Sequence, residues 1–214
     1  VRNDKGETQH YVALFTDITA LKENERKLEH VAHHDALTGL PNRTLLRDRL
    51  QQALNTARRQ RTKVAVAFVD LDHFKHINDS LGHHVGDLIL QAVGNRLRAI
   101  TRDSDTICRH SGDEYIVLLP NVHDSGEVAH VAEKIVEALS QPYPVGSDEL
   151  IVTPSVGLSL YPDDGDTVDT LIRNADAAMY HAKGSGRRTF QFFLPAMNEK
   201  EQKRLLVNTA VRRA

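Results

Sequence analysis

Hydrophobic residues recur along the chain with two periods, one typical of strands and one typical of helices. Residues 63–69 (KVAVAFV) form an apolar run of strand length, and apolar residues between Val85 and Ile100 recur at helical spacing. Further helices are predicted over 44–60, 74–81, about 125–140 and 167–183, and strands over 106–110, 114–119, 150–160 and 188–193. The alternation predicts an α/β fold in which helices pack against one central sheet.

The two ends of the chain differ in pattern from this middle part. Residues 1–19 carry alternating apolar side chains that predict one strand, and residues 20–34 are helical, with Leu21, Leu28 and Val31 on one stripe. That stripe would allow the helix to pair with a copy of itself, with Asn24 in the seam. Residues 194–214 are again helical and polar. We expect the chain to be a fragment of a longer protein.

Composition narrows the class of protein. The chain has 214 residues and a formal net charge of −2, so no global basic field would recruit nucleic acid or an anionic membrane. The single cysteine, Cys108, excludes an internal disulfide and fits a reducing compartment. No apolar run approaches the roughly 20 residues of a membrane span, and no signal peptide begins the chain. We therefore expect a cytoplasmic domain without membrane contact of its own.

A first acidic cluster follows the apolar strand. Asp70 and Asp72 alternate onto one face, and Leu71 offers its carbonyl between them. Magnesium prefers such hard oxygen ligands together with the phosphates of a substrate. The next helix begins with the amides of His73 and Phe74 beside Lys75, a typical seat for phosphate. For Asp72 the plainer interpretation, a helix N-cap, is favoured.

A second acidic pair lies in the predicted turn between residues 110 and 114. Asp113 and Glu114 follow Gly112, and a hairpin here would bring two more carboxylates toward the first pair. Two neighbouring acids in a turn are common, so this pair alone is a weak signal.

Four ordered segments together resemble the GGDEF family of diguanylate cyclases: DALTGLPNR, FVDLDHFKHINDSLGHHVGD, RHSGDEY and NADAAMYHAKGSGR. The resemblance covers residues 35–193. It implies a central, mostly antiparallel sheet flanked by helices, similar to the palm of nucleotide cyclases. It also implies that a homodimer condenses two GTP into cyclic di-GMP and pyrophosphate, with Mg²⁺, or Mn²⁺ in its place, as cofactor.

The resemblance also implies roles for individual residues. Asp70, the Leu71 carbonyl and Asp113 would hold the metal, and Glu114 would help to ligate it or activate the attacking 3′-hydroxyl. Asn78 and Asp87 would bind the guanine edge. The phosphates would be held by His73, Phe74, Lys75, Lys183 and Arg187.

Arg102 and Asp105 form the RxxD pattern at the distance that the family uses for an inhibitory product site. An arginine can grip guanine or phosphate in a bidentate manner. A chance surface ion pair between these two residues is the alternative interpretation.

Two features leave the function open. The signature reads SGDEY, and Ser111 in place of glycine would cost about 1 kcal/mol or more if that position needs a positive φ. Residues 1–19 also resemble the end of a PAS sensor domain, and residues 194–214 the lead-in to an EAL phosphodiesterase domain. An active cyclase is therefore expected, and a weakly active or inactive GTP-binding module that controls an EAL domain is the alternative.

Overall fold

The computed structural model describes residues 4–5, 17, 19, 22, 30–146 and 148–197. The chain divides into two units, residues 1–32 and 33–214. In the first unit, the Thr19 amide donates a hydrogen bond to Asp17 Oδ1 (2.9 Å). The predicted strand before residue 17, most of the predicted pairing helix and the tail after residue 197 lie outside the described residues. Val31 of the predicted stripe is described, and its side chain is 71% exposed.

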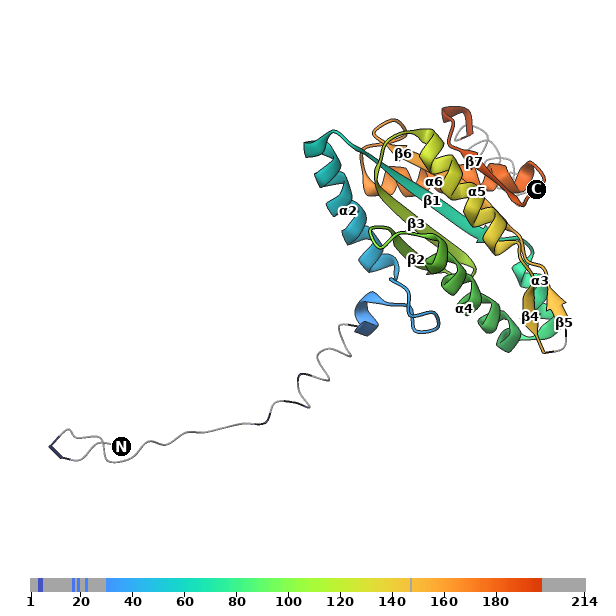
Figure 1. Cartoon of the computed structure of the whole chain (residues 1–214), viewed down its shortest axis with the longest axis horizontal. Coiled ribbons are helices and arrows are strands. Elements are labelled where there is room, and N and C mark those ends of the chain that lie inside the picture. Colours follow the sequence, from blue (N-terminus) through green and yellow to red (C-terminus); the bar gives the residue numbers. More distant parts are fainter. Residues whose placement is uncertain are drawn as a thin grey trace, which may run out of the picture. The chain divides into compact units, whose positions relative to one another are not determined.

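The second unit is built around a five-stranded sheet with the order β2-β3-β1-β6-β7 (Figure 1). All neighbouring strands are antiparallel except β6 and β7. This confirms the mostly antiparallel central sheet flanked by helices. The elements are α2 (Arg43–Gln60), β1 (Lys63–Leu71), α3 (Phe74–Leu81), α4 (His83–Ile100), β2 (Thr106–Ser111), β3 (Glu114–Val122), α5 (Ser125–Leu139), β4 (Tyr143–Val145), β5 (Asp148–Leu150), β6 (Pro154–Tyr161), α6 (Val168–Gly184) and β7 (Thr189–Phe192).

One predicted strand was placed partly wrongly. The range 150–160 was assigned to one strand, but β6 begins at Pro154, Leu150 ends β5 of a separate two-stranded sheet with β4, and residues 151–153 connect β5 to β6. Strands β4 and β5 have three residues each, and Gly146 between them has φ +63°. Strands this short carry too few side chains to show an alternating pattern.

Strand β1 lies in the middle of the sheet and is buried on both faces after Lys63. Its odd-numbered side chains from Ala65 to Leu71 pack into the core beneath α4 and α5, whereas Val64, Val66 and Phe68 pack against α2 and α6. Because side chains alternate along a strand, Asp70 continues the second set and lies on the α2 and α6 face.

Helix α6 lies unusually close to the sheet. A Cβ atom at Gly157 of β6 would lie 2.0 Å from the Ala175 carbonyl oxygen and 2.0 Å from the Met179 nitrogen. Only glycine permits this approach, which brings the C-terminal turn of α6 over the end of β1.

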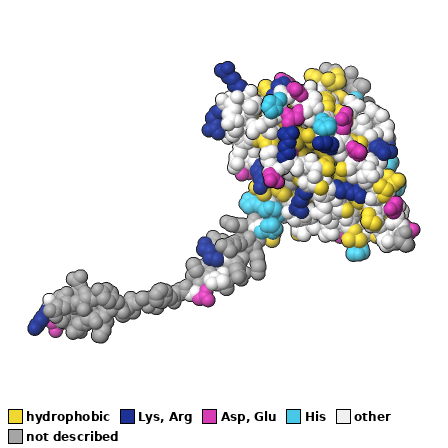
Figure 2. Space-filling model, in the orientation of Figure 1, with side chains coloured by type: hydrophobic (Ala, Val, Ile, Leu, Met, Phe, Trp, Pro, Cys, Tyr) yellow, Lys and Arg dark blue, Asp and Glu magenta, His cyan; other side chains and the backbone are white. Residues whose placement is uncertain are grey.

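The surface of this unit carries charges of both signs. On the face that Figure 2 shows, Lys and Arg side chains lie among Asp and Glu side chains, as a net charge near zero leads one to expect. Within the described part of the chain, no helix combines the length and the hydropathy needed to cross a bilayer.

Candidate active site

Two carboxylates of the predicted site, the metal ligand Asp70 and the catalytic Glu114, lie on adjacent strands. Asp70 near the end of β1 is directly opposite Glu114 at the start of β3. Directly opposed residues of antiparallel strands project from the same face, so both belong to the α2 and α6 side of the sheet. Asp113 precedes Glu114 in the turn between β2 and β3. The sheet therefore brings together the two acidic clusters that the sequence places more than 40 residues apart.

Asp70 is buried, with 7% of its surface exposed, and its Oδ1 is 2.8 Å from the Lys183 ammonium. Burial raises the pKa of Asp70 to about 6, the Lys183 charge opposes this rise, and the charges of Asp113 and Glu114 add to it. Burial also raises the pKa of Asp113. A cluster that resists ionisation in this way would bind a cation favourably, because the cation removes the repulsion between the carboxylates.

The residues present fit a magnesium ion whose coordination shell would be completed by phosphates of the substrate. The Asp72 amide donates to the Thr153 carbonyl (2.8 Å), and because hydrogen-bonded pairs alternate along an antiparallel ladder, the backbone carbonyl of Leu71 points away from β6, toward the β3 side of β1. Within the described ranges, no three His, Cys, Asp or Glu side chains converge into a ready metal site. Magnesium commonly uses one or two carboxylates and keeps water or phosphate at its other positions, so Asp70, the Leu71 carbonyl and Asp113 would suffice as protein ligands.

Asp72 does not cap a helix, so that prediction was wrong. The N-cap of α3 is His73, which has φ 58° and makes no side-chain cap bond. Asp72 is buried and accepts hydrogen bonds from the hydroxyls of Thr153 (2.7 Å) and Ser155 (2.7 Å) and from the Arg188 amide (3.2 Å). It therefore ties the end of β1 to the start of β6 and to the loop that follows α6.

That loop carries one of the two cations on and after α6 that are predicted to hold phosphate. Arg187 has φ 62°, and its Nε lies 3.9 Å from Asp72 Oδ1. The other cation, Lys183, lies one helical turn earlier and faces Asp70. The predicted phosphate residues of α3 occupy its first turn, where Phe74 is buried in the core and His73 and Lys75 are exposed.

The predicted guanine residues lie on neighbouring helices. Asn78 of α3 has a buried Oδ1 without a hydrogen-bond partner, and Asp87 of α4 is exposed. A Cβ atom at Gly86 would lie 1.9 Å from that oxygen. An orphaned buried acceptor normally marks a place for a ligand or water. Gly86 thus leaves room for the Asn78 amide, and a glycine inside an amphipathic helix is the signal that could have revealed it.

The signature turn is not strained at its serine. Gly112 has φ +45°, whereas the φ angle of Ser111 is not positive. The condition under which serine would cost backbone free energy, a positive φ at this position, is therefore not met. The Ser111 hydroxyl instead donates a hydrogen bond to Glu114 Oε2. The hydroxyl of Tyr115 donates to the Leu90 carbonyl (2.8 Å) inside the core, so tyrosine satisfies its polar atom there.

Arg109 braces the turn, a role that sequence reasoning missed. Its Nε donates to the Gly112 carbonyl (2.9 Å), and its Nη1 pairs with Asp35 (3.1 Å). Asp35 in turn accepts from the amide (2.8 Å) and the hydroxyl (2.6 Å) of Thr38. The segment DALT before α2 and the arginine of RHSGDEY are therefore joined by hydrogen bonds behind the signature turn.

At the RxxD pattern, the ion pair between Arg102 and Asp105 is not formed. The Asp105 carboxylate accepts from the Arg102 amide (2.9 Å), and the Arg102 guanidinium pairs with Glu127 (2.9 Å). The backbone amide of His123 and its ring hydrogen-bond to Glu127 and, with Arg102, lower the pKa of that carboxyl to about 2. Glu127 was not predicted from the sequence, because its contact with Arg102 spans 25 residues.

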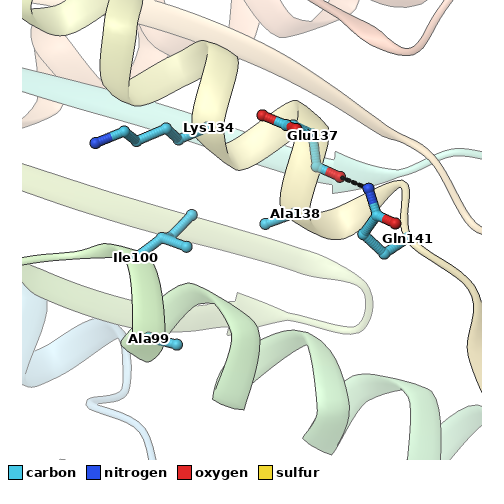
Figure 3. A pocket seen from close by; sticks show the side chains of 6 residues that line it. All are labelled: Ala99, Ile100, Lys134, Glu137, Ala138 and Gln141. Carbon is cyan, nitrogen blue, oxygen red and sulfur yellow. Dashed lines mark hydrogen bonds between the residues drawn. The ribbon is translucent and has the colours of Figure 1, made fainter.

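A pocket of about 460 Å³ begins next to this pattern, between the end of α4 and α5 (Figure 3). Its walls include Ile100, two residues before Arg102, and Lys134, two helical turns beyond Glu127. Gln141 Nε2 donates to the Glu137 carbonyl (3.4 Å) at the far side.

Comparison with known proteins identifies the family of this fold. The family model described as "Diguanylate cyclase, GGDEF domain" matches residues 32–189. The chain belongs to the GGDEF family. The bifunctional diguanylate cyclase/cyclic di-GMP phosphodiesterase MucR of Pseudomonas aeruginosa is 46% identical over 196 residues, which are 92% of this chain and 28% of MucR.

Two further relatives have solved structures of GGDEF domains. Diguanylate cyclase TpbB of P. aeruginosa is 39% identical over 168 residues (78% of this chain, 39% of TpbB). The structure of its GGDEF domain matches with a TM-score of 0.77 and 36% identity, covering 79% of this chain and 99% of that one. The coiled coil and GGDEF domain of DgcB from Caulobacter crescentus, in complex with c-di-GMP, match with a TM-score of 0.74 and 28% identity over 82% and 93% of the two chains.

Proposed function

We propose that this GGDEF domain is a diguanylate cyclase that converts two GTP into cyclic di-GMP and two pyrophosphates. The observation that carries the proposal is the placement of buried Asp70 opposite Glu114, with Asp113 in the adjoining turn. The Lys183 ammonium lies 2.8 Å from Asp70 Oδ1. Relatives named as diguanylate cyclases, TpbB and MucR, support it.

The guanine would enter beside Asn78 and Asp87. The unpartnered Asn78 oxygen and the Asp87 carboxylate are acceptors, and the guanine edge presents N1–H and N2–H₂ donors. Adenine presents no donor at its N1 position, so these two residues would select GTP over ATP. The absence of a side chain at Gly86 leaves the Asn78 amide its place.

The phosphates would extend from α3 toward α6. The first-turn amides of α3 and Lys75 would hold one end, and Lys183 and Arg187 the other. Magnesium, held by Asp70, the Leu71 carbonyl and Asp113, would supply charge neutralisation for the phosphates. Lys183 would then exchange its ion pair with Asp70 for one with phosphate oxygens, since the cation takes its place beside the carboxylate.

The reaction needs two domains. Each 3′-hydroxyl would attack the α-phosphorus of the other GTP, which breaks the bond to the β-phosphate oxygen and releases pyrophosphate. Glu114 would help to ligate the metal or accept the hydroxyl proton. One domain offers one guanine pocket, so two domains would face each other in an antiparallel homodimer. By pairing with its copy, the helix predicted over residues 20–34 would raise the effective concentration of one domain near the other.

Product inhibition would act through Arg102 and Asp105. Cyclic di-GMP offers two guanines and two phosphates, which suit a guanidinium and a carboxylate. In DgcB the bound ligand is c-di-GMP, which supports a GGDEF domain as receptor for the product. The Arg102–Glu127 pair would have to open for the guanidinium to reach it.

The second candidate is a weakly active or inactive GTP-binding module that controls an adjacent EAL domain. The bifunctional relative MucR favours it, because this chain spans 28% of MucR, which leaves room for further domains. On this proposal residues 1–19 end a PAS domain, residues 20–34 are a linker helix, residues 35–193 form the GGDEF domain, and residues 194–214 lead toward the EAL domain in the cytoplasm.

The deciding experiment incubates the chain with GTP and Mg²⁺ and detects cyclic di-GMP by chromatography. The variant Asp113→Asn should lose synthesis by at least a hundredfold and keep its circular dichroism spectrum, because the turn keeps its shape but loses a metal ligand. Asp148→Asn, an exposed change on β5, is the matched control. GTP binding without product in the unaltered chain would establish the second candidate instead.

A further inference from the structure

Ser111 stands where the family signature has its first glycine, and its hydroxyl donates a hydrogen bond to the Glu114 carboxylate. The two residues are direct partners across the turn that joins β2 to β3. A glycine has no side chain with which to make this bond. The structure therefore contains a polar contact at a catalytic carboxylate that the usual signature cannot form.

The position of this bond matters because Glu114 has a strand on each side. Ser111 lies opposite it on β2, and Asp70 lies opposite it on β1. Neighbouring strands are about 4.8 Å apart, so Ser111 and Asp70 are separated by about 10 Å, with Glu114 between them. A carboxylate bonded to the Ser111 hydroxyl is thus drawn to the side away from Asp70.

The surroundings of Glu114 agree with this direction. Its side chain lines a pocket of about 300 Å³ together with Arg43, His110 and Arg173. The metal residues Asp70 and Asp113 are not part of that lining. Asp70 meanwhile pairs with Lys183. Two different donors thus bind the two opposed carboxylates, and in the part of the chain that is described no group of three or more His, Cys, Asp and Glu side chains is placed to hold a metal ion.

We propose that Ser111 is a positioning residue that restrains Glu114 and thereby weakens cation binding at the catalytic cluster. A cation that recruits Glu114 must break the Ser111 bond, whereas in a domain with glycine there is no such bond to break. The net strength of one hydrogen bond corresponds to a threefold to tenfold effect on cation affinity. This inference rests on the proposed function for the identity of the ion and deepens it: the serine signature sets a higher divalent-metal requirement.

The experiment measures Mn²⁺ binding by electron paramagnetic resonance, with and without the non-condensing analogue α,β-methylene-GTP. Ser111→Ala removes the hydroxyl with little change in backbone freedom, and it should bind Mn²⁺ three to ten times more tightly. Ser111→Thr keeps a hydroxyl and should match the unaltered chain. The Mg²⁺ concentration for half-maximal synthesis should shift in the same order, with the KM for GTP unchanged.

The restraint acts through Glu114, and a double-mutant cycle tests that route. In a Glu114→Gln background, Ser111→Ala should no longer change Mn²⁺ affinity. Equal Mn²⁺ affinity in the Ser111→Ala variant and the unaltered chain would overturn the proposal, as would an undiminished effect in the Gln background. If the analogue fails to strengthen Mn²⁺ binding in every variant, the GTP assignment fails, while the effect of Ser111 without the analogue still decides the restraint.

Discussion

Replacing Asp70 by asparagine should stabilise the domain while it destroys the proposed catalysis. Burial raises the pKa of Asp70 from an ordinary 3.8 to about 6, so the fold favours the protonated carboxyl. Each pKa unit corresponds to about 1.36 kcal/mol, and the difference amounts to about 3 kcal/mol. Asparagine has the same shape and no charge to bury. Lys183, which lies partly in contact with solvent, can turn to water when its partner is neutral.

The sign of the effect follows from proton binding. Between about pH 4 and pH 6 the folded chain binds a proton at Asp70 that the unfolded chain has released. The free energy of unfolding of the unaltered chain should therefore fall as pH rises through this window and stay lower above it. The Asp70→Asn variant lacks this fall. The free energy of unfolding of the variant should equal that of the unaltered chain below pH 4 and exceed it by about 3 kcal/mol at pH 8.

The assay is urea unfolding followed by circular dichroism at pH 4, 5, 6 and 8, with buffers of equal ionic strength. Asp163→Asn is a suitable control, because that exposed carboxylate pairs with Lys63 at the surface and should change stability by less than about 1 kcal/mol. A difference between Asp70→Asn and the unaltered chain that stays constant from pH 4 to pH 8 would refute the reasoning.

Three further changes have equally definite expectations. Gly86→Ala places a methyl group against the Asn78 amide and should weaken GTP binding in calorimetry at least tenfold, whereas Gly184→Ala, whose added Cβ would have nothing within 4 Å, should not. Arg102→Ala should weaken binding of cyclic di-GMP and raise the amount of product formed, while removal of the competing charge in Glu127→Gln should strengthen binding; equal affinities would reduce the site to a surface ion pair. Removal of residues 1–34 should lower specific activity at low protein concentration without changing GTP affinity per domain, and activity independent of concentration would contradict assembly through that helix.

Local periodicity accounts for the parts of the fold that were predicted correctly. The apolar run of β1 and the amphipathic pattern of α4 are long enough to show their periods, and both elements formed where expected. The three-residue strands β4 and β5 were missed because they contain less than two full alternations. The roles of the site residues still rest on the family resemblance. The structure adds the side chains and backbone groups that contact them.

Contacts between distant parts of the chain account for what the sequence did not reveal. Asp72 had the chemistry of an N-cap, yet its hydrogen-bond partners Thr153 and Ser155 lie more than 80 residues away. The pairing of Arg102 with Glu127 likewise needs the position of α5 relative to the turn before β2. No local pattern specifies such partners, because each depends on how separate elements pack.

Gly157, a residue of the sheet, controls the position of Lys183, which we propose holds phosphate. Gly157 contacts the backbone of α6 at Met179, and Lys183 lies one turn further along the same helix. Any side chain at position 157 would push α6 away from β6. The Lys183 ammonium group would then move away from Asp70. Random mutagenesis scored for lost synthesis should therefore recover substitutions at a buried glycine that touches neither nucleotide nor metal.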